Sequence, residues 1–312
     1  MPNDTDIRQA VTDRVLAALE AGTAPWHKSW SAIGGGLPRS IGSGKAYRGI
    51  NVFILGMSDY ANPWWGTYNA MAEKSGMVKN GSRWESPDGT PRGVRKGEKG
   101  TQIILWKQFP KNVMNEETGK TEKKSFMLLR SFYVFNAEQV DALPGKYFPA
   151  TKEGAEKVEE HVEASIVAKE YFGREGAPAL FYGGDKAYYN GASDSIRLPK
   201  AEDFEGDHEF QATKFHEMAH STGHKSRCAR PGVMEFDHFG SEKYGKEELV
   251  AEMTAAMLMA TCGIETTFDN SAAYLSSWIE TIRGDNSLVV QAGAQAQRAM
   301  DMILDTKFED ES

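Results

Sequence analysis

The segment KFHEMAHSTGH, residues 214–224, constrains the fold of this chain more than any other feature. It places His216 and His220 four positions apart, with Glu217 directly after the first histidine. On an α-helix, side chains at this spacing lie on one face about 6 Å apart along the axis, so both imidazoles can reach one metal ion. Glu217 can then accept a proton from a water at the metal. The segment therefore predicts a metal-binding helix that ends at Gly223.

A bare match of this kind also occurs by chance in helices that bind no metal. Here Phe215, Met218 and Ala219 give the segment an apolar helical face, and a glycine soon after His220 can end the helix. This context favours a buried helix that presents both histidines on one side.

A catalytic zinc usually has three protein ligands, so the motif needs one more. His224 continues the same stripe, but a continuous helix would place it about 12 Å from His216, too far for one ion. Position 226, where a more distant histidine ligand would fall, is serine. We therefore expect His224 to line the pocket or support the ligands, unless Gly223 bends it back. The alternative is that His224 is only a positively charged side chain at the C-terminal end of the helix.

The segment KEELVAEMTAAML, residues 246–258, is the better source of the third ligand. It predicts a mostly apolar helix with Glu248 and Glu252 on one side, and two like charges on a buried face are costly unless something compensates them. We assign Glu248 as the third ligand and Glu252 as the carboxylate that accepts an N–H from a ligand histidine. The two roles could be exchanged, and two solvated glutamates are the other alternative. This donor set suits Zn²⁺, with Mn²⁺ or another divalent ion as the alternative.

Charge is distributed unevenly along the chain. The 312 residues carry a formal net charge of −8, which on its own argues against a nucleic-acid partner. Residues 1–150, however, have 20 basic and 14 acidic side chains, a net charge of +6, whereas residues 151–312 have 16 and 30, a net charge of −14. Six of the seven tryptophans also lie in the first half. Such an asymmetry indicates two domains with different tasks.

The overall composition excludes several classes of protein. An apolar fraction of 40% and a charged fraction of 26% are ordinary for a globular protein and exclude a disordered, collagenous or coiled-coil chain. No apolar run is long enough to cross a membrane, and the N-terminal MPNDTDIRQA lacks the apolar stretch of a signal peptide. Cys228 and Cys262 cannot make a disulfide framework and suit a reducing compartment, so we expect a cytoplasmic protein without a membrane partner.

The first half has the residue types of a single-strand-binding surface. Proteins hold single strands with cationic grooves along the phosphates and aromatic faces on which bases stack. The candidate phosphate contacts are Arg48, Asn51, Arg95, Lys96 and Lys99, and the candidate stacking platforms are Trp64, Trp65 and Tyr68. The alternative for each aromatic residue is a place in the core.

Periodicity and turn residues predict the remaining elements. The first half is expected to contain a helix over 7–19 and two buried strands, 101–106 and 126–135, joined by a mobile polar loop over 107–125. The composition changes around residues 141–154, where we place the domain boundary. The second half is expected to contain a helix over 152–172, two short strands within 186–199, and helices over 209–220, 246–261 and 272–283, the last continuing toward 304.

The chain combines an HExxH motif, in HEMAHSTGHKSR, with a later ExxxE motif, in FGSEKYGKEELVAEM. This combination resembles the glutamate-type zincins, a class of metallopeptidases. These segments are similar to the C-terminal domain of ArdC-type antirestriction proteins of conjugative plasmids. Five segments of the first half match the single-stranded-DNA-binding N-terminal domain of that family in order and spacing. They are PWHKSW, YRGINVFIL, WWGTYNA, VRKGEKGTQIILW and FYVFNAEQV. The resemblance extends from about Pro25 to about Gly263. It implies that Glu248 rather than Glu252 is the ligand, and that an edge strand in KAYYNGASDSIRLP binds peptide.

The resemblance implies an α+β protein with a mixed α/β DNA-binding domain, residues 1–145, and a zincin-like metallopeptidase domain, residues 146–312. The first hypothesis is an antirestriction protein that binds single-stranded DNA, or also double-stranded DNA, and protects incoming DNA from host restriction. The alternative is a DNA-localised zinc metallopeptidase whose main activity is proteolysis of a protein target. A third hypothesis treats the metal as structural and the chain as a binding module.

Overall fold

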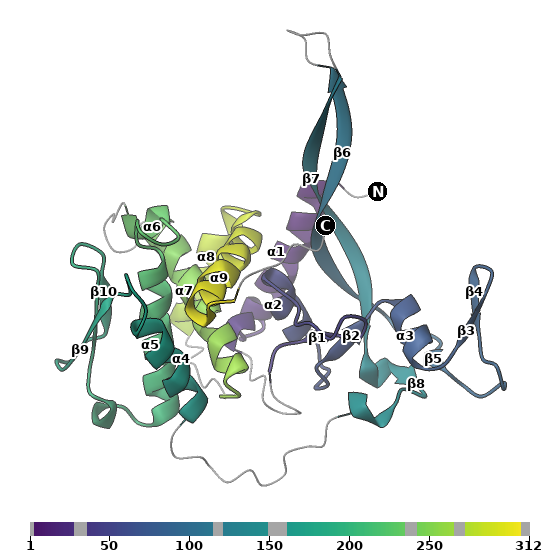
Figure 1. The fold of residues 1–312 in the computed structure, drawn as a ribbon, viewed down its shortest axis with the longest axis horizontal. Coiled ribbons are helices and arrows are strands. Elements are labelled where there is room, and N and C mark those ends of the chain that lie inside the picture. The colour runs from purple at the N-terminus through teal and green to yellow at the C-terminus, as the bar shows by residue number, and fades with distance from the viewer. Residues whose placement is uncertain are drawn as a thin grey trace.

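The structure is a computed structural model that describes residues 3–27, 36–114, 121–148, 161–234, 242–264 and 272–306. Helices and short strands are mixed throughout these ranges, so the predicted α+β class is confirmed. Figure 1 shows a helical body on the left, a long hairpin that rises from the middle, and a lobe of short strands on the right.

The helical body is arranged around α7 (Glu242–Thr261). From Leu249 to Ala260 almost every side chain of this helix is buried, and a helix that is apolar all round must be enclosed by other elements. The helices that pack directly against it are α5 (Asp207–Thr222), α6 (Pro231–Met234), α8 (Ala272–Arg283) and α9 (Leu288–Leu304). The helix α4 (Val162–Phe172) contacts α5 and α9. No described helix is both long and apolar enough to cross a lipid bilayer.

The predicted helices of the second half are confirmed with small changes of boundary. The helix α5 ends at Thr222 with Gly223 as its C-cap, as the glycine predicted. The predicted stretch from 272 toward 304 is two helices, α8 and α9. The helix predicted over 152–172 is described only from Val162, because residues 149–160 lie outside the described ranges.

A three-stranded sheet lies beside α5. It consists of β9 (Ala179–Tyr182), β10 (Tyr188–Asn190) and β11 (Ser195–Leu198) in the order β10–β11–β9. The two strands predicted around Asn190 pair antiparallel as expected, and β9 adds to β11 in parallel. The strand β10 therefore lies at an edge of the sheet, and it contacts α5.

The first helix, α1 (Asp4–Glu20), begins with a capping box. The backbone N–H of Asp6 donates to the Asn3 side chain at 2.9 Å, and the N–H of Asn3 donates to the Asp6 carboxylate at 3.0 Å. These bonds satisfy N–H groups that have no partner within the helix. The helix buries Ile7, Val15 and other apolar side chains at helical spacing, as predicted.

The hairpin consists of β6 (Thr101–Met114) and β7 (Thr121–Asn136), which pair antiparallel from Thr101 opposite Val134 to Met114 opposite Thr121. The strand predictions are confirmed, but the prediction of a loop over all of 107–125 is wrong, because the backbone ladder continues to Met114 and resumes at Thr121. Residues 115–120 lie outside the described ranges. Figure 1 shows the hairpin projecting from the body.

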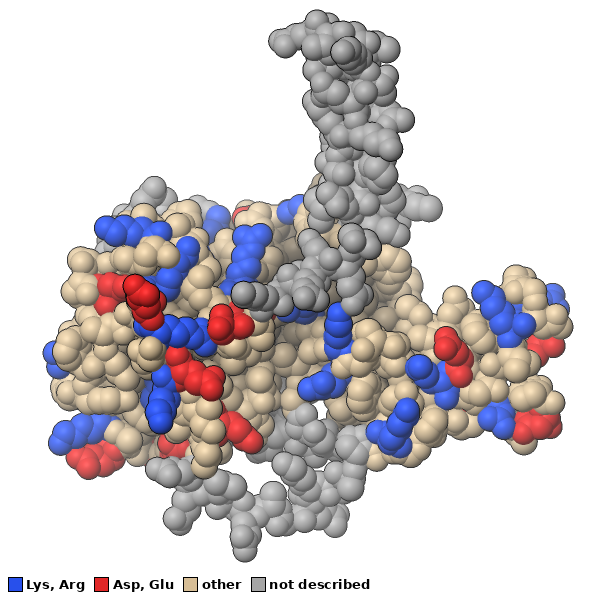
Figure 2. Space-filling view, viewed as in Figure 1, with Lys and Arg blue, Asp and Glu red and all other residues tan. Residues whose placement is uncertain are grey.

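Short elements complete the N-terminal half. The strands β1 (Arg39–Ser40) and β2 (Trp64–Gly66) extend the hairpin into a sheet of order β1–β2–β7–β6. The lobe beside it contains α3 (Tyr68–Lys74), the hairpin of β3 (Val78–Asn80) and β4 (Arg83–Glu85), and the pair β5 (Gly93–Val94) and β8 (Val140–Asp141). In Figure 2 the surface over β1, β2 and α3 shows mostly basic side chains, whereas the left-hand body shows basic and acidic side chains side by side.

One hydrophobic core joins the two halves of the chain. It runs from Ile7 in α1 to Ile303 in α9, and α1 packs against both α8 and α9. The helix α2 (Ile50–Gly56) also packs on α9, where a Cβ added to Gly293 would lie 2.7 Å from the backbone nitrogen of Ile50. The boundary between residues 145 and 146 remains a prediction.

Candidate functional site

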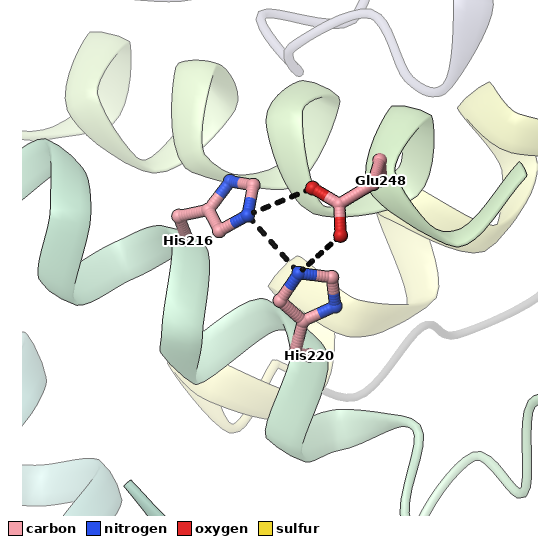
Figure 3. Close-up of side chains that lie close together, drawn as sticks. All are labelled: His216, His220 and Glu248. Carbon is pink, nitrogen blue, oxygen red and sulfur yellow. Dashed lines mark hydrogen bonds and ion pairs between the residues drawn. The ribbon is translucent and has the colours of Figure 1, made fainter. Parts of the chain in front are cut away.

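The helices α5 and α7 bring His216, His220 and Glu248 together. The Nε2 atoms of the two histidines are 3.0 Å apart. One carboxylate oxygen of Glu248 lies 3.4 Å from His216 Nε2, and the other lies 3.3 Å from His220 Nε2. Figure 3 shows the three side chains converging on one point between the helices, and one ligand atom from each lies within 4.8 Å of the others. Two imidazole nitrogens and a carboxylate so placed are a donor set that fits a divalent metal.

The electrostatics of the cluster also fit a cation. Burial lowers the pKa of His220, but hydrogen bonds with Glu247 and Glu248 outweigh burial and raise the pKa to about 10. The pKa of His216 is also raised, because the hydrogen bond with Glu248 and the nearby carboxylates outweigh burial. Burial raises the pKa of Glu248, yet its hydrogen bonds with the two histidines bring that pKa well below its usual range. The site therefore favours positive charge between the carboxylates.

The outward-facing nitrogen of each histidine has a different acidic neighbour. His220 Nδ1 lies 3.2 Å from Glu247 Oε1, and His216 Nδ1 lies 3.9 Å from Glu252 Oε1. The sequence prediction included Glu252 and missed Glu247. The available signal was the adjacent pair Glu247–Glu248, since neighbouring residues of a helix point about 100° apart and can serve different sides of one site.

Glu247 is itself held by a buried arginine. Arg230 donates through Nε and Nη2 to the two carboxylate oxygens of Glu247, at 2.8 and 2.6 Å. The same guanidinium donates to Thr222 Oγ1 and to the carbonyl oxygen of Ala219, both on α5. The bidentate pair keeps the pKa of Glu247 below its usual range despite burial. Arg230 thus connects Glu247 to the C-terminal end of α5, the helix that carries His216 and His220.

Glu217 and His224, the other two residues predicted at or near the metal, lie in different places. Glu217 follows His216 on α5 and is 7% exposed. His224 lies beyond the end of α5, where its Nδ1 is 2.7 Å from Ser226 Oγ and 3.8 Å from an Asp194 carboxylate oxygen. The structure therefore does not bring His224 into the group formed by His216, His220 and Glu248.

An ion pair fastens the β10–β11 turn to the end of α5. Arg227 donates through both Nη atoms to the carboxylate of Asp194, and its Nε donates to the carbonyl oxygen of Ser221 at 2.7 Å. The Tyr189 hydroxyl donates to the same carboxylate at 2.8 Å. Asp194 has a positive φ of 47°, a conformation that aspartate adopts more readily than most residues. These contacts set the edge strand beside the histidine helix.

Four of the predicted DNA-contact residues have structural partners in the fold. Trp65 is 2% exposed and lies in the core. Trp64 packs edge-on against Tyr147, with ring centroids 5.4 Å apart. The Asn51 side chain bonds to both the N–H and the carbonyl of Ile104, and Arg48 forms an ion pair with Asp301. Trp65 therefore offers no ring face for stacking.

The other four predicted residues lie at the base of the β6–β7 hairpin. Tyr68 is 46% exposed and packs edge-on against Phe135, and Tyr133 of the same strand is 60% exposed. The loop containing the exposed Arg95, Lys96 and Lys99 ends at Gly100, where an added Cβ would lie 3.1 Å from Tyr133 Cβ and 3.2 Å from Phe135 Cζ. We call Tyr68, Tyr133, Phe135, Lys96 and Lys99 the hairpin-base patch. Sequence reasoning missed Tyr133, because it lies in a run predicted as a buried strand.

Arg95 differs from the two lysines of this loop. Its guanidinium donates to Glu98 and to the carbonyl oxygen of Glu138. It also lies 3.7 Å from an Asp141 carboxylate oxygen. These contacts attach the loop to β8, so we leave Arg95 out of the hairpin-base patch.

Two family models match the chain. Residues 5–135 match the N-terminal domain of the anti-restriction factor ArdC, and residues 167–295 match a zincin-like metallopeptidase. Among curated proteins, a DNA primase TraC of Escherichia coli is 34% identical over 95% of this chain, and a second TraC of that species is 32% identical over 95%. The chain spans only 27% and 20% of the length of these two proteins.

Other relatives match over almost their whole length. The uncharacterized protein y4eC of Sinorhizobium fredii is 31% identical, over 96% of this chain and 92% of its own length. The crystal structure of the metal-free antirestriction protein ArdC from plasmid R388 is 33% identical, with a TM-score of 0.70 and 96% of each chain covered. Its Mn(II)-bound structure is 32% identical, with a TM-score of 0.70, over 97% of this chain and all of that one. The predicted resemblance is confirmed, and this chain belongs to the ArdC family of antirestriction proteins.

Proposed function

We propose that this protein binds single-stranded DNA through its N-terminal half and protects incoming DNA from host restriction, with a divalent metal held in its zincin-like half. Membership of the ArdC family, with similarity over both halves of the chain, is the observation that carries this proposal. The names of the two TraC relatives also associate such a sequence with DNA.

The residues proposed to hold the metal are His216, His220 and Glu248. Their donor atoms are close enough to share one ion, and the donor set suits Zn²⁺. The Mn(II)-bound ArdC relative makes Mn²⁺ a second choice. When bound, such an ion supplies Lewis-acid chemistry toward a carbonyl group and a water molecule. Dialysis against each metal, followed by elemental analysis, would establish which ion the protein retains.

Peptide hydrolysis requires a base as well as a metal site, and Glu217 is the candidate. It lies on the histidine helix directly after His216, where its carboxylate can take a proton from water and pass it to a leaving amine. The variant His216→Ala is expected to lose metal, whereas Glu217→Ala should retain it, because Glu217 is not a proposed ligand. Equal metal content in the wild type and His216→Ala would contradict the assignment.

The hairpin-base patch is the proposed DNA-contact surface. The patch contains two exposed tyrosines and two exposed lysines beside a glycine-flanked turn. Single-stranded DNA can stack its bases on the aromatic rings and place its phosphates beside the lysines. Double-stranded DNA keeps its bases stacked inside the duplex, so the patch should prefer single strands. Binding of labelled single strands and duplexes at several salt concentrations tests this preference. Binding that does not weaken with salt would contradict phosphate contacts.

The alternative function is a metallopeptidase that DNA binding only brings to its protein target. The zincin-like match and the position of Glu217 favour it. A restriction-protection assay separates the two functions. If protection is unchanged in Glu217→Gln, proteolysis is dispensable and the metal serves another purpose, whereas loss of protection with intact DNA binding identifies proteolysis as the main activity.

A further inference from the structure

The β3–β4 hairpin carries a tryptophan outside the hydrophobic core. This hairpin forms a two-stranded sheet of its own at the outer end of the lobe of short strands, as Figure 1 shows. Its strand residues are all exposed except Trp84, which is half-buried. Among the described residues, Trp84 belongs to neither of the two hydrophobic clusters. A tryptophan that is partly in water and partly covered is characteristic of interaction surfaces.

Two contacts hold the indole of Trp84 in place. Its N–H donates to Asn69 Oδ1 in α3 at 3.0 Å. Lys79 lies directly opposite Trp84 in the β3–β4 ladder, so the two side chains share one face of the hairpin, and Lys79 Nζ is 5.9 Å from the centroid of the ring. A hydrogen bond at the edge of an indole fixes its orientation without covering its faces. The hairpin therefore presents an oriented ring beside an exposed ammonium group.

Asn69 connects this ring to the hairpin-base patch. It directly follows Tyr68 in α3, so the Cα atoms of these two residues are about 3.8 Å apart. Tyr68 belongs to the hairpin-base patch, where it is 46% exposed and packs edge-on against Phe135. The aromatic side chains thus form a series from the base of the β6–β7 hairpin, across the start of α3, to Trp84.

The opposite face of the β3–β4 hairpin has a different composition. There Val78 lies across from Glu85, and Asn80 lies across from Arg83. The Asn80 amide donates to the Glu85 carboxylate at 3.2 Å. This face has an exposed carboxylate and no aromatic ring, whereas a nucleotide of a single strand needs a ring for its base and a cation for its phosphate. Only the face with the tryptophan matches that chemistry.

We propose that Trp84 and Lys79 form a second contact for single-stranded DNA, with one base on the indole and a phosphate beside the ammonium group. A bound strand would then run from the hairpin-base patch across α3 to the β3–β4 hairpin. The inference rests on the proposed binding of single strands and adds the path and the length of the site. A short strand fills the hairpin-base patch alone, whereas a longer strand reaches both contacts and gains affinity from the second.

The first test measures affinity as a function of strand length. Fluorescence anisotropy is used with labelled oligothymidines of about 4 to 16 nucleotides, which spans the site sizes of OB folds. Trp84→Ala is expected to bind the longest strands roughly 10-fold more weakly than the wild type, as for the loss of one stacked base, and to bind the shortest strands normally. Equal affinity at every length overturns the proposal. An equal loss at every length also overturns it, because the hairpin would then only support α3.

Matched variants separate stacking from the support of the hairpin. Trp84→Phe keeps a ring for stacking and loses the N–H that bonds to Asn69, so it should retain more affinity for long strands than Trp84→Ala. If the two variants are equally weak, the hydrogen bond matters and the ring does not, which contradicts the proposal. Val78→Ala changes an exposed side chain on the opposite face of the same hairpin and should bind all strands as the wild type does.

The charge of Lys79 gives a separate measurement. Lys79→Ala should reduce the slope of log affinity against log salt by about 0.7 with long strands and leave it unchanged with short ones. Arg83→Ala removes a positive charge from the opposite face and is the control, with an unchanged slope for both. The same slope in Lys79→Ala and the wild type with long strands would remove Lys79 from the contact.

Photo-crosslinking of the wild-type protein completes the test without any substitution. Long oligothymidines that carry a single iodouracil at successive positions should crosslink to Trp84 from a position near one end, and mass spectrometry identifies the residue. If the wild type binds no single strand, the proposed function fails and this inference fails with it. If Tyr133→Ala weakens binding while Trp84→Ala does not and no crosslink forms at Trp84, only this inference fails. Should Trp84→Ala not fold, the crosslink and Lys79→Ala decide.

Discussion

His220 Nδ1 lies 3.2 Å from Glu247 Oε1, on the side of the imidazole that faces away from the candidate metal position. The contact leaves Nε2 directed toward His216 and Glu248. Because a neutral imidazole carries one N–H, a carboxylate at Nδ1 selects the tautomer whose Nε2 lone pair is available to a metal. The two helices thus supply both the candidate ligands and a carboxylate that orients one of them.

We expect Glu247→Gln to weaken metal binding by roughly 10- to 100-fold, since an amide is a poorer acceptor for the imidazole N–H and lacks the charge that pairs with Arg230. Competition with a chelating dye measures this. Glu280→Gln, which changes an exposed carboxylate of α8, is the control and should bind metal as the wild type does. Equal affinity in Glu247→Gln would show that His220 needs no support from this carboxylate.

Arg230→Ala should destabilise the metal-free protein by about 3–5 kcal/mol, because it leaves the carboxylate of Glu247 buried without its bidentate partner. Urea unfolding measures the change in the free energy of unfolding. Arg283→Ala breaks the exposed pair between Arg283 and Glu20, and such pairs contribute at most about 1 kcal/mol. Similar losses in both variants would mean that burial does not set the strength of the Arg230 pair.

The sequence predicted the three residues that converge between α5 and α7 far better than the residues around them. Two histidines at helical spacing define a face, so the spacing of His216 and His220 was enough to pair them. Which glutamate of α7 meets which nitrogen depends on the rotation of α7 about its axis relative to α5. No single helix encodes that rotation, so Glu252 was predicted beside a ligand histidine and Glu247 was not.

The arrangement of the two halves was not predicted for a similar reason. Net charge and tryptophan content describe each half separately, whereas contact between them depends on small matching features. The clearest of these features is a stripe on α9 formed by Gly293, Gln297 and Asp301. Gly293 lies against the backbone of Ile50, and Gln297 accepts a hydrogen bond from the N–H of Gly49. Asp301 forms an ion pair with Arg48. A predicted phosphate contact, Arg48, is therefore an ion-pair partner of this stripe.

This contact makes an unusual prediction for Gly293→Ala. Alanine in place of glycine inside a helix normally stabilises by up to about 1 kcal/mol. Here the added methyl would lie 2.7 Å from the Ile50 nitrogen, so we expect a loss of about 1–3 kcal/mol in thermal or urea unfolding. Gly245→Ala in α7 is the control, because its methyl would only touch Thr281 at 3.5 Å, and it should be neutral or stabilising. A stabilised Gly293→Ala would refute the close approach of α2 and α9.

Tyr133→Ala should weaken binding of single-stranded DNA by about 1–3 kcal/mol at every salt concentration, since it removes a stacking surface and no charge. Lys99→Ala should instead reduce the slope of log affinity against log salt by about 0.7. Tyr188→Ala, an exposed tyrosine on β10, is the control and should bind DNA normally. Fluorescence anisotropy over a salt series measures all three variants. Wild-type binding by Tyr133→Ala would remove the hairpin base from the DNA-contact surface.

Asp194→Asn should destabilise the protein in a manner that depends on pH. Burial raises the pKa of Asp194, but the hydrogen bonds from Arg227 and Tyr189 outweigh burial, so the pKa lies below its ordinary value. A carboxylate with a lowered pKa in the folded state stabilises the fold above its unfolded pKa of about 4 and loses this contribution as pH falls through the folded value. We therefore expect Asp194→Asn to cost about 2 kcal/mol at pH 7, as for a hydrogen bond to a charged group. The unfolding free energies of the variant and the wild type should converge as pH falls below about 4. A difference that stays constant from pH 7 to pH 3 would show that the charge of Asp194 is not what fastens the β10–β11 turn to α5.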